Sequence, residues 1–502
     1  MLNLVFDIIV ISSNAKLFIR PLSWLLLTLL LVQVQFGYAL NTQPEDTASE
    51  ILPKSYEAVL ARVIAAYPNL QSAVIQVQRS TLELDRIYAT LTWKAAVDTS
   101  ISHDLAGFGT PADSVVARGV LSRLLESGDS ISLDASYNRV DNEIVFVPTL
   151  PNPSNDTAIN LSYRKPLKKG AGNVEYQSRK EAARAQVSSS QAEEFELRDL
   201  LAKQVAGLYF GLATIEVNLD NTREGIDRLQ RLLEYVERNK KLGVSEEKDI
   251  LQSQARLDRK RAELASLETA RNQQVFNLNR LINIPATTQF TSQLDYSEQV
   301  IPDRESLLEE VFAYSPALNK AYASKKAAES NIDLQRNNKK DVVDVIVSVG
   351  ARSKIGPAQE TDIDETDLAG KVGLEYRAAL DKSGLIAALQ QAILSRDIAD
   401  NQIHQLDIDL SNEVDRLQGL IRDQKKSIVS KIRLKEAEKQ KFDEAVSRFR
   451  TGRTTTADLI IFEEDLSISE AALANAQVEL VSSINELSRL RGTIWLTLDD
   501  YR

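Results

Sequence analysis

The sequence predicts an α+β membrane protein, in which a transmembrane β-barrel shared between chains continues into long α-helical coiled coils. Three observations support this fold class: an exported N-terminus, a tandem structural repeat, and strands of alternating polarity beside helices with a 3.5-residue period. The chain has 502 residues, of which 43% are hydrophobic, and this composition excludes a wholly disordered protein.

The N-terminus has the features of a secretory signal peptide over residues 1–39. Lys16 and Arg20 precede an apolar run that ends at Val34, and Ala39 closes a small-residue cleavage site. The run has about 13 residues, fewer than the ~20 that span a bilayer, so an uncleaved anchor is the less favoured alternative. We expect an exported chain that is periplasmic, secreted or part of an outer-membrane barrel.

The rest of the chain is a tandem duplication. Residues 67–70 (YPNL) match 315–318 (SPAL), 248 positions later, and residues 159–167 match 372–380, 213 positions later. Repeat 1 therefore has 35 more residues between its strands than repeat 2. The predicted divisions are an N-terminal extension at 40–53, repeat 1 at 54–301 and repeat 2 at 302–502.

Each repeat is predicted to run helix, strands, very long helix, helix. The helices of repeat 1 are expected at 54–92, 173–241 and 245–283, with strands in 94–167. The helices of repeat 2 are expected at 303–340, 383–450 and 454–492, with strands at 342–352 and 370–380, within 342–380. A helix of about 68 residues is roughly 100 Å long, which is longer than a globular core can cover.

The helices have the period of a left-handed coiled coil. Apolar residues within 201–236 recur at alternating steps of four and three, and a leucine recurs every seven residues from Leu459 to Leu487. We expect each long helix to pack antiparallel on the helix that follows it. The turns are predicted at Gly243 and Gly452, where glycine supplies a left-handed C-cap. The basic run at 256–261 is interpreted as a solvated face.

The predicted strands alternate with period two. Ile159 and Leu161 share one face while Asn160 and Ser162 share the other, as lipid-facing and lumen-facing residues of a barrel do. A soluble sheet with one wet face is the alternative. One chain offers about four strands, or five to six if 110–155 also crosses, whereas a barrel needs at least about eight. Because open edges cannot face lipid, the barrel must be shared between chains.

The composition argues against catalysis. The chain has no cysteine and only two histidines, His103 and His404, so disulfides and thiolate sites are excluded and zinc or haem chemistry is disfavoured. The net charge of −11 argues against a nucleic-acid partner. The glycine-rich segment 168–172 lacks the spacing and the Ser/Thr of a phosphate loop, and a strand-to-helix turn explains it better. We predict no enzyme, no cofactor and no metal site.

These features together resemble the TolC-type outer-membrane efflux family over roughly residues 50–495. The markers are YPNL (67–70) and SPAL (315–318), the tract SYRKPLKKGAG (162–172), and RFRTG (448–452) with Asp458 after it. The resemblance implies a homotrimer, with a 12-stranded barrel in the outer membrane and an α-helical tunnel through the periplasm. It also implies a passive, gated exit channel that works with a periplasmic adaptor and an inner-membrane pump or secretion ATPase.

The resemblance also places a gate beside the two glycine turns. Asp249 and Asp458 match acids that follow the turns, Phe449 occupies the position of the family's gating tyrosine, and Arg453 lies one place before the position of its gate arginine. Three copies of Asp458 around an axis would select cations. The alternative is that both acids are ordinary first-turn residues favoured by the helix dipole.

The tips of the two turns would contact the adaptor through Leu242, Gly243, Thr451 and Gly452, although capping alone also explains the glycines. Efflux and type I protein secretion are not separated by the sequence. A periplasmic coiled-coil scaffold or adaptor without a pore is the alternative from another class, and a diverged member that does not transport is a further one.

Overall fold

The computed structural model describes residues 55–104, 111–143, 150–243, 245–285, 288–294, 296, 300–358 and 362–498. The chain divides into two units, Met1–Ile51 and Leu52–Arg502, and every described residue belongs to the second unit. The predicted signal peptide at 1–39 and the extension at 40–53 lie outside the described residues.

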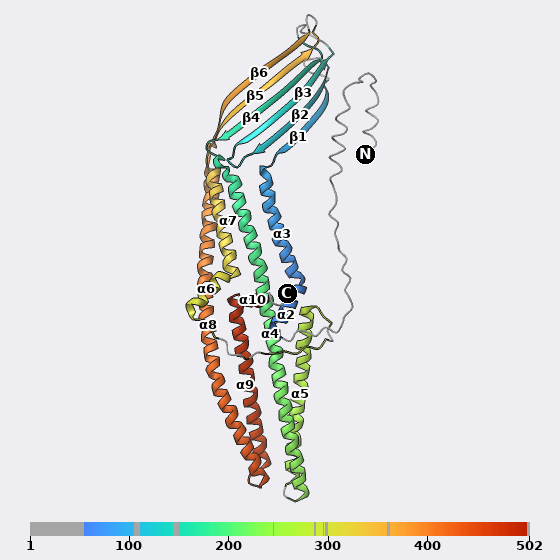
Figure 1. Cartoon of the computed structure of the whole chain (residues 1–502), viewed down its shortest axis with the longest axis vertical. Coiled ribbons are helices and arrows are strands. Elements are labelled where there is room, and N and C mark those ends of the chain that lie inside the picture. Colours follow the sequence, from blue (N-terminus) through green and yellow to red (C-terminus); the bar gives the residue numbers. More distant parts are fainter. Residues whose placement is uncertain are drawn as a thin grey trace, which may run out of the picture. The chain divides into compact units, whose positions relative to one another are not determined.

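The described residues form long helices and one sheet, drawn in Figure 1. In repeat 1 the elements are α2 (Tyr56–Ala66), α3 (Pro68–Tyr88), β1 (Lys94–Asp104), β2 (Ala112–Leu124), β3 (Ser130–Asn142), β4 (Ser154–Pro166), α4 (Val174–Lys241) and α5 (Glu247–Ile282). In repeat 2 they are α6 (Arg304–Tyr314), α7 (Pro316–Asn338), β5 (Val342–Gly356), β6 (Ile363–Arg377), α8 (Ser383–Arg450), α9 (Thr456–Leu490) and α10 (Thr493–Leu498). Two 3₁₀ turns, at Ala89–Leu91 and Ala171–Asn173, join helices to strands.

The opening helix of each repeat is broken, which corrects the single helices expected at 54–92 and 303–340. The breaks fall before Pro68 and Pro316, each the first residue of its helix. Proline lacks an N–H and disfavours the helical conformation of the residue before it, so Tyr67 is extended (φ −79°, ψ 115°). The chain bends by 60° between α2 and α3.

The long helices pack on the helices that follow them, α4 on α5 and α8 on α9. Four of the five leucines that recur every seven residues in α9 are buried: Leu459, Leu466, Leu473 and Leu487. In α4 most of the apolar stripe from Leu201 to Val236 is buried, and the remaining members are half-buried. Because burial follows the seam that the 3.5-residue period defines, packing of the seam stabilises these helices.

α4 is also apolar enough, by length and composition, to cross a membrane, and it is the one such unbroken helix among the described residues. It packs against α3, α5, α7 and α9 in this structure, and its side chains line the largest apolar cluster. Its hydropathy is therefore that of a helix surrounded by other helices.

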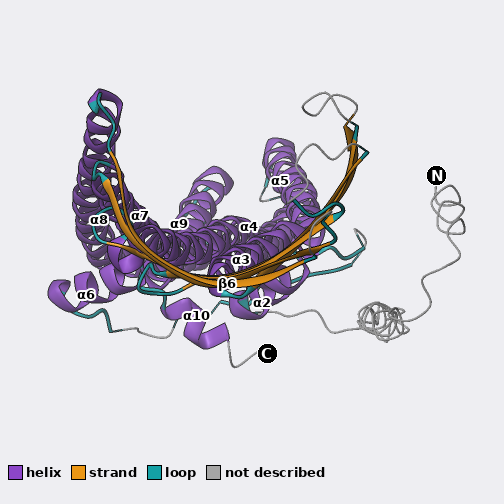
Figure 2. Cartoon of the chain, turned by 90° about the horizontal axis from the view of Figure 1, so that it is seen from above, coloured by secondary structure: helices purple, strands orange, loops and turns teal. Residues whose placement is uncertain are grey.

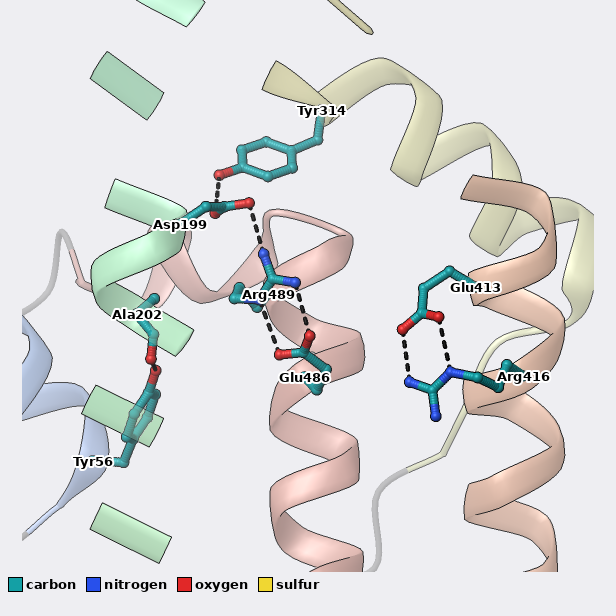
Figure 3. Close-up of polar contacts among 8 residues, drawn as sticks. All are labelled: Tyr56, Asp199, Ala202, Tyr314, Glu413, Arg416, Glu486 and Arg489. Carbon is teal, nitrogen blue, oxygen red and sulfur yellow. Dashed lines mark hydrogen bonds and ion pairs between the residues drawn. The ribbon is translucent and has the colours of Figure 1, made fainter. Parts of the chain in front are cut away.

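A polar clamp joins the two repeats halfway along the helices (Figure 3). Arg489 of α9 binds Asp199 of α4 at 2.8 Å, and Glu486 at 2.8 and 2.9 Å, while the Tyr314 hydroxyl donates to Asp199 at 2.9 Å. Gly492 lies beside Tyr314 with φ +73°, and a Cβ there would meet the ring at 2.3 Å. Only glycine therefore admits the tyrosine that completes this clamp.

The six strands form one sheet in the order β1-β2-β3-β4-β5-β6, with every neighbouring pair antiparallel. Figure 2 shows that the sheet is curved, and that α2, α6 and α10 lie on the convex side of the arc. The resemblance implied twelve strands for three chains, or four strands in each chain. The two further strands are β2 and β3, which fall in the extra segment of repeat 1.

Candidate functional site

The two faces of the sheet differ in chemistry, and cross-strand pairing keeps each face continuous across all six strands. One row on the first face reads Ala95, Leu121, Leu133, Leu161, Val349 and Gly370. The adjacent row on the second face reads Lys94, Ser122, Ser132, Ser162, Ser348 and Lys371. The alternation predicted from Ile159 to Ser162 therefore extends over the whole sheet.

The apolar face carries charge only near its ends. Its charged residues and histidine are His103, Asp113, Arg139, Asp141 and Asp364 toward the strand loops, and Arg123 and Lys165 toward the helices. Tyrosines lie toward both ends of the uncharged band, with Tyr137 near the loops and Tyr163 and Tyr376 near the helices. An apolar band between aromatic and charged rims matches the lipid-facing surface of a transmembrane barrel.

The apolar side chains are also the more exposed ones. In β3, Leu133, Ala135 and Tyr137 are exposed whereas the intervening Asp134 and Ser136 are half-buried. A soluble sheet would bury the apolar set, so this pattern favours an apolar solvent on the apolar face. The exposed fraction reaches 84% at Ile101 in β1 and 86% at Leu368 in β6.

The polar face is held by ion pairs between strands. Arg118 binds Asp134, Arg352 binds Asp156 at 3.4 Å, and Arg164 bridges Asp344 at 3.0 Å and Glu375 at 2.8 Å. Charges of both signs alternate here, so this surface is hydrated without a strong field of one sign.

The outer edges of β1 and β6 carry no partner strand among the described residues. These edges present backbone N–H and C=O groups beside the most exposed apolar side chains of the sheet. Such an edge is not tolerated in hydrocarbon, so a sheet of this kind in a membrane needs another chain to pair with it.

The far ends of the helices form two hairpin tips, one between α4 and α5 and one between α8 and α9. Gly243 (φ 76°) and Gly452 (φ 70°) make the left-handed turns, and their N–H groups donate to Lys240 and Phe449 carbonyls at 2.9 and 3.0 Å. Leu242 is 76% exposed, and Gly243, Thr451 and Gly452 are exposed beside it on the two tips. All four predicted tip residues thus lie at the surface.

Asp249 and Asp458 occupy equivalent positions, three residues after the N-caps of α5 and α9. The Glu246 N–H donates to Asp249 Oδ2 at 3.0 Å, while the Thr455 hydroxyl and N–H donate to Asp458 Oδ2 at 2.7 and 3.3 Å. Both carboxylates therefore complete capping boxes. They remain half-exposed, so capping leaves them able to face an aqueous passage.

Phe449 and Arg453 are only four residues apart in sequence, but their environments differ. Phe449 is buried and packs against the Tyr235 ring at a centroid separation of 5.2 Å, within an apolar cluster that joins the two tips. The Tyr235 hydroxyl donates to the Arg450 carbonyl at 3.4 Å. Arg453 is exposed. Phe449 thus holds the hairpins together, and Arg453 is the side chain available to solvent.

A buried ionic cluster, which the sequence did not predict, lies above the tips. Arg228 of α4 binds Glu463 at 3.3 Å and Glu470 at 2.9 Å, and these three side chains are 11%, 1% and 8% exposed. Burial raises the pKa of Glu463, and nearby cationic groups only partly offset this. Glu463 and Glu470 are seven residues apart beside the leucine seam, and this spacing is the one feature of the sequence that indicates the cluster.

Two members of the basic run belong to the same cluster, which corrects its interpretation as a solvated face. Arg256 binds Glu464 at 3.1 Å with its side chain 11% exposed, and Lys260 binds Glu263 at 3.0 Å with its side chain 10% exposed. Within the described residues, no group of three or more His, Asp or Glu side chains is arranged to hold a metal ion.

The fold of this chain is similar to that of solved outer-membrane channels. The outer membrane protein VceC from Vibrio cholerae superposes with a TM-score of 0.62 at 15% identity, over 87% of this chain and 96% of that one. The CmeC outer membrane channel from Campylobacter jejuni gives 0.59 at 12% identity, over 87% and 85%. These likenesses show a shared fold.

Sequence comparisons match about one third of the chain, and the chain spans about one third of the curated relative that it matches. The family model described as Outer membrane efflux protein matches residues 130–283. Protein CyaE of Bordetella pertussis is 30% identical over 168 residues, which cover 33% of this chain and 35% of that protein. The match over residues 130–283 confirms the resemblance to outer membrane efflux proteins that the motifs indicate.

Proposed function

We propose that this chain is the protomer of a homotrimeric outer-membrane exit channel, a passive and gated conduit that serves an efflux or type I secretion system. One observation carries the proposal: an open-edged sheet with an exposed apolar face and a polar face, continued by helices about 100 Å long. The family of outer membrane efflux proteins supports the same conclusion. The sheet would lie in the outer membrane of a Gram-negative cell, and the helices would lie in the periplasm.

The barrel closes when β6 of one copy pairs with β1 of the next. The sheet has an even number of strands in simple antiparallel order, so β6 and β1 run in opposite directions. Pairing between copies is therefore antiparallel, as in transmembrane barrels, and a closed ring leaves no edge in lipid. The apolar band then faces lipid and the polar face lines the passage.

The gate would lie at the hairpin tips. Three symmetry-related Asp458 side chains, each fixed by its capping hydrogen bonds, would form an acidic ring that selects cations and binds multivalent ones. Asp249 would add charge nearby, and Arg453 could pair with these acids in the closed state. Phe449 would act by holding the hairpins together, since its ring is buried against Tyr235.

The exposed tips would bind a periplasmic adaptor, which in turn would contact an inner-membrane pump or secretion ATPase. Leu242 offers an apolar side chain at the end of one hairpin, and Thr451 with Gly452 offers a small surface at the other. Apolar and small residues at a helical tip suit packing against another helical hairpin.

Cysteine cross-linking tests the closure of the barrel, and the chain contains no native cysteine to interfere. Val97→Cys on β1 is combined in turn with Leu368→Cys or Val372→Cys on β6, and membranes are oxidised. We expect covalent dimers and trimers from at least one pair. The matched control combines Val97→Cys with Leu133→Cys, at the middle of the sheet, and should give monomers.

A pore-free periplasmic scaffold predicts the opposite result. Such a protein would be released with the periplasmic fraction, and no edge pair would give interchain products. That outcome would refute the proposed channel.

A further inference from the structure

The strand count of this chain departs from the twelve-stranded trimer that its resemblance implied. β2 and β3 form a hairpin inserted between β1 and β4, in the 35 residues that repeat 2 lacks. Repeat 2 contributes two strands and repeat 1 contributes four. The question is whether the inserted hairpin belongs to the barrel wall.

Pairing places the hairpin within the wall. β2 and β3 have 13 residues each, the same length as β4. β1 pairs with β2 from Lys94 to Asp104, β3 pairs with β4 from Ser130 to Val140, and β1 does not pair with β4. The hairpin thus separates β1 from β4 along their whole lengths.

The two faces of the hairpin continue those of its neighbours. Leu121 and Leu133 continue the apolar row, and Ser122 and Ser132 continue the polar row. A hairpin folded outside the wall would have no reason to keep this register, because a slip of one residue exchanges the two faces.

The turn of the hairpin is anchored to the start of α4. The Gly172 N–H donates to the Ser127 carbonyl at 3.0 Å, and the Asn173 side chain donates to the Leu125 carbonyl at 3.0 Å. The Tyr163 hydroxyl donates to Asp129 Oδ2 at 2.8 Å. The glycine-rich tract before α4 therefore has a specific role, which is to hold this turn.

Glycine makes that anchor possible. Gly128 has φ +91°, and a Cβ there would lie 2.4 Å from the Gly170 carbonyl oxygen and 2.9 Å from the Asn173 nitrogen. The backbones of the turn and of the strand-to-helix connection thus approach more closely than a side chain allows. A close contact of this kind fixes the hairpin relative to both β4 and α4.

We propose that the trimer forms an 18-stranded barrel, whose outer-membrane lumen admits a polypeptide segment as wide as two packed helices. The proposal rests on the proposed function, because the factor of three comes from the trimer. Strands about 4.8 Å apart and tilted by about 40° give a backbone diameter of roughly 36 Å for 18 strands and roughly 24 Å for 12.

The wider barrel changes the class of solute that can pass. Side chains occupy about 5 Å of each radius, which leaves a lumen of roughly 26 Å with 18 strands and roughly 14 Å with 12. One helix is about 10 Å wide, and two packed helices are about 20 Å across. The mixed charges of the polar face, such as Arg118 with Asp134, form a hydrated wall that does not bind one sign of charge strongly.

Spin-label distances in the purified trimer test the strand count. A single cysteine in each chain gives three equivalent spins, separated by about 31 Å at the backbone for 18 strands and about 21 Å for 12. Neighbouring residues point to opposite faces, so the label shortens the interspin distance at one residue and lengthens it at the other. Averaging the distances measured in Ser348→Cys and Val349→Cys therefore cancels the length of the label. Ser132→Cys and Leu133→Cys, which lie in the same cross-strand rows on β3, form the matched pair in the inserted hairpin.

We expect means near 31 Å from both pairs. A mean near 21 Å from the β5 pair would overturn the wide barrel while leaving a trimeric channel intact. A signal from isolated spins, with no interspin distance, would overturn the trimer and therefore the proposed function as well.

Labelling of Ser348→Cys tests how large a solute the lumen admits. In intact cells the thiol should react with a small maleimide and with a maleimide-polymer about 20 Å across, the width of two packed helices. Reaction with the small reagent alone would overturn the proposed solute class. Loss of the polymer reaction in a Gly128→Val background, with trimers retained, would further support the role of the anchored hairpin.

Discussion

The clamp at Arg489 allows a quantitative test of how the two repeats are held together. Replacing Arg489 by Met keeps the length of the side chain and removes its charge and donors. The variant leaves Asp199 and Glu486, 16% and 24% exposed, without their shared cation. Burial raises the pKa of Asp199, whereas the pKa of Glu486, which burial alone would raise, is lowered by its contacts with Arg489.

The expected cost follows from burial. Removing one partner of a buried ion pair costs about 3–5 kcal/mol, and the partial exposure here places the effect near 3 kcal/mol. The matched control is Arg416→Met, because Arg416 pairs with Glu413 in the same two-bond geometry on an exposed surface (Figure 3), with side chains 56% and 35% exposed. That pair contributes at most about 1 kcal/mol.

The assay is urea unfolding of the detergent-extracted protein, followed by circular dichroism at 222 nm. We expect Arg489→Met to lower the free energy of unfolding by about 3 kcal/mol and Arg416→Met to lower it by less than about 1 kcal/mol. Equal effects of the two variants would refute the reasoning, because burial would then not determine the contribution of these ion pairs.

Three further predictions follow from single sites. Gly492→Ala should lower the free energy of unfolding by about 1–3 kcal/mol, because alanine is strained at φ +73° and meets the Tyr314 ring. A Tyr314→Ala background should recover part of this loss. An unchanged free energy of unfolding in the native background would contradict the clamp. Phe449→Ala should cost about 3 kcal/mol and speed amide exchange at the tips, whereas Phe449→Leu should cost about 1 kcal/mol. Unchanged exchange in both variants would contradict packing of the hairpins by this ring. Burial raises the pKa of Glu463, so the contribution of this group to stability is present below its unfolded pKa and is lost as pH rises through its folded pKa. In Glu463→Gln the urea midpoint of unfolding should therefore change less between pH 4 and neutrality than it does in the native protein. Coincident profiles of midpoint against pH would show that Glu463 does not titrate in this range.

The sequence predicts the helical part of the fold well because one period governs it. The leucines from Leu459 to Leu487 sit on one seam, and packing requires that seam to be buried. The breaks before Pro68 and Pro316 were also visible as prolines. The apolar pattern continues across both prolines and predicts unbroken helices, but the backbone restriction of proline decides the local conformation.

The number of strands and the buried ions were harder to predict. Alternation in 130–142 indicates a strand, but only pairing with β2 and β4 shows that the segment joins the same sheet. Arg256 and Lys260 are polar by type, and their burial depends on where α9 presents its acids. Such contacts between distant segments leave no periodic signal in either segment alone.

The roles of the tip residues depend on the assembly. Asp458 completes a capping box within one chain, and that local role is sufficient to explain an acid at this position. A ring of charge exists only when three copies surround an axis. The capping geometry therefore fixes the side chain, and symmetry would give it a second role.

Single-channel conductance in a planar bilayer tests the central claim most directly. We expect the purified trimer to give discrete, cation-selective steps that a trivalent cation blocks from the side of the helical tips. The block should weaken in Asp458→Asn but not in Asp423→Asn, an exposed acid on α8. A folded trimer without any conductance would contradict the account.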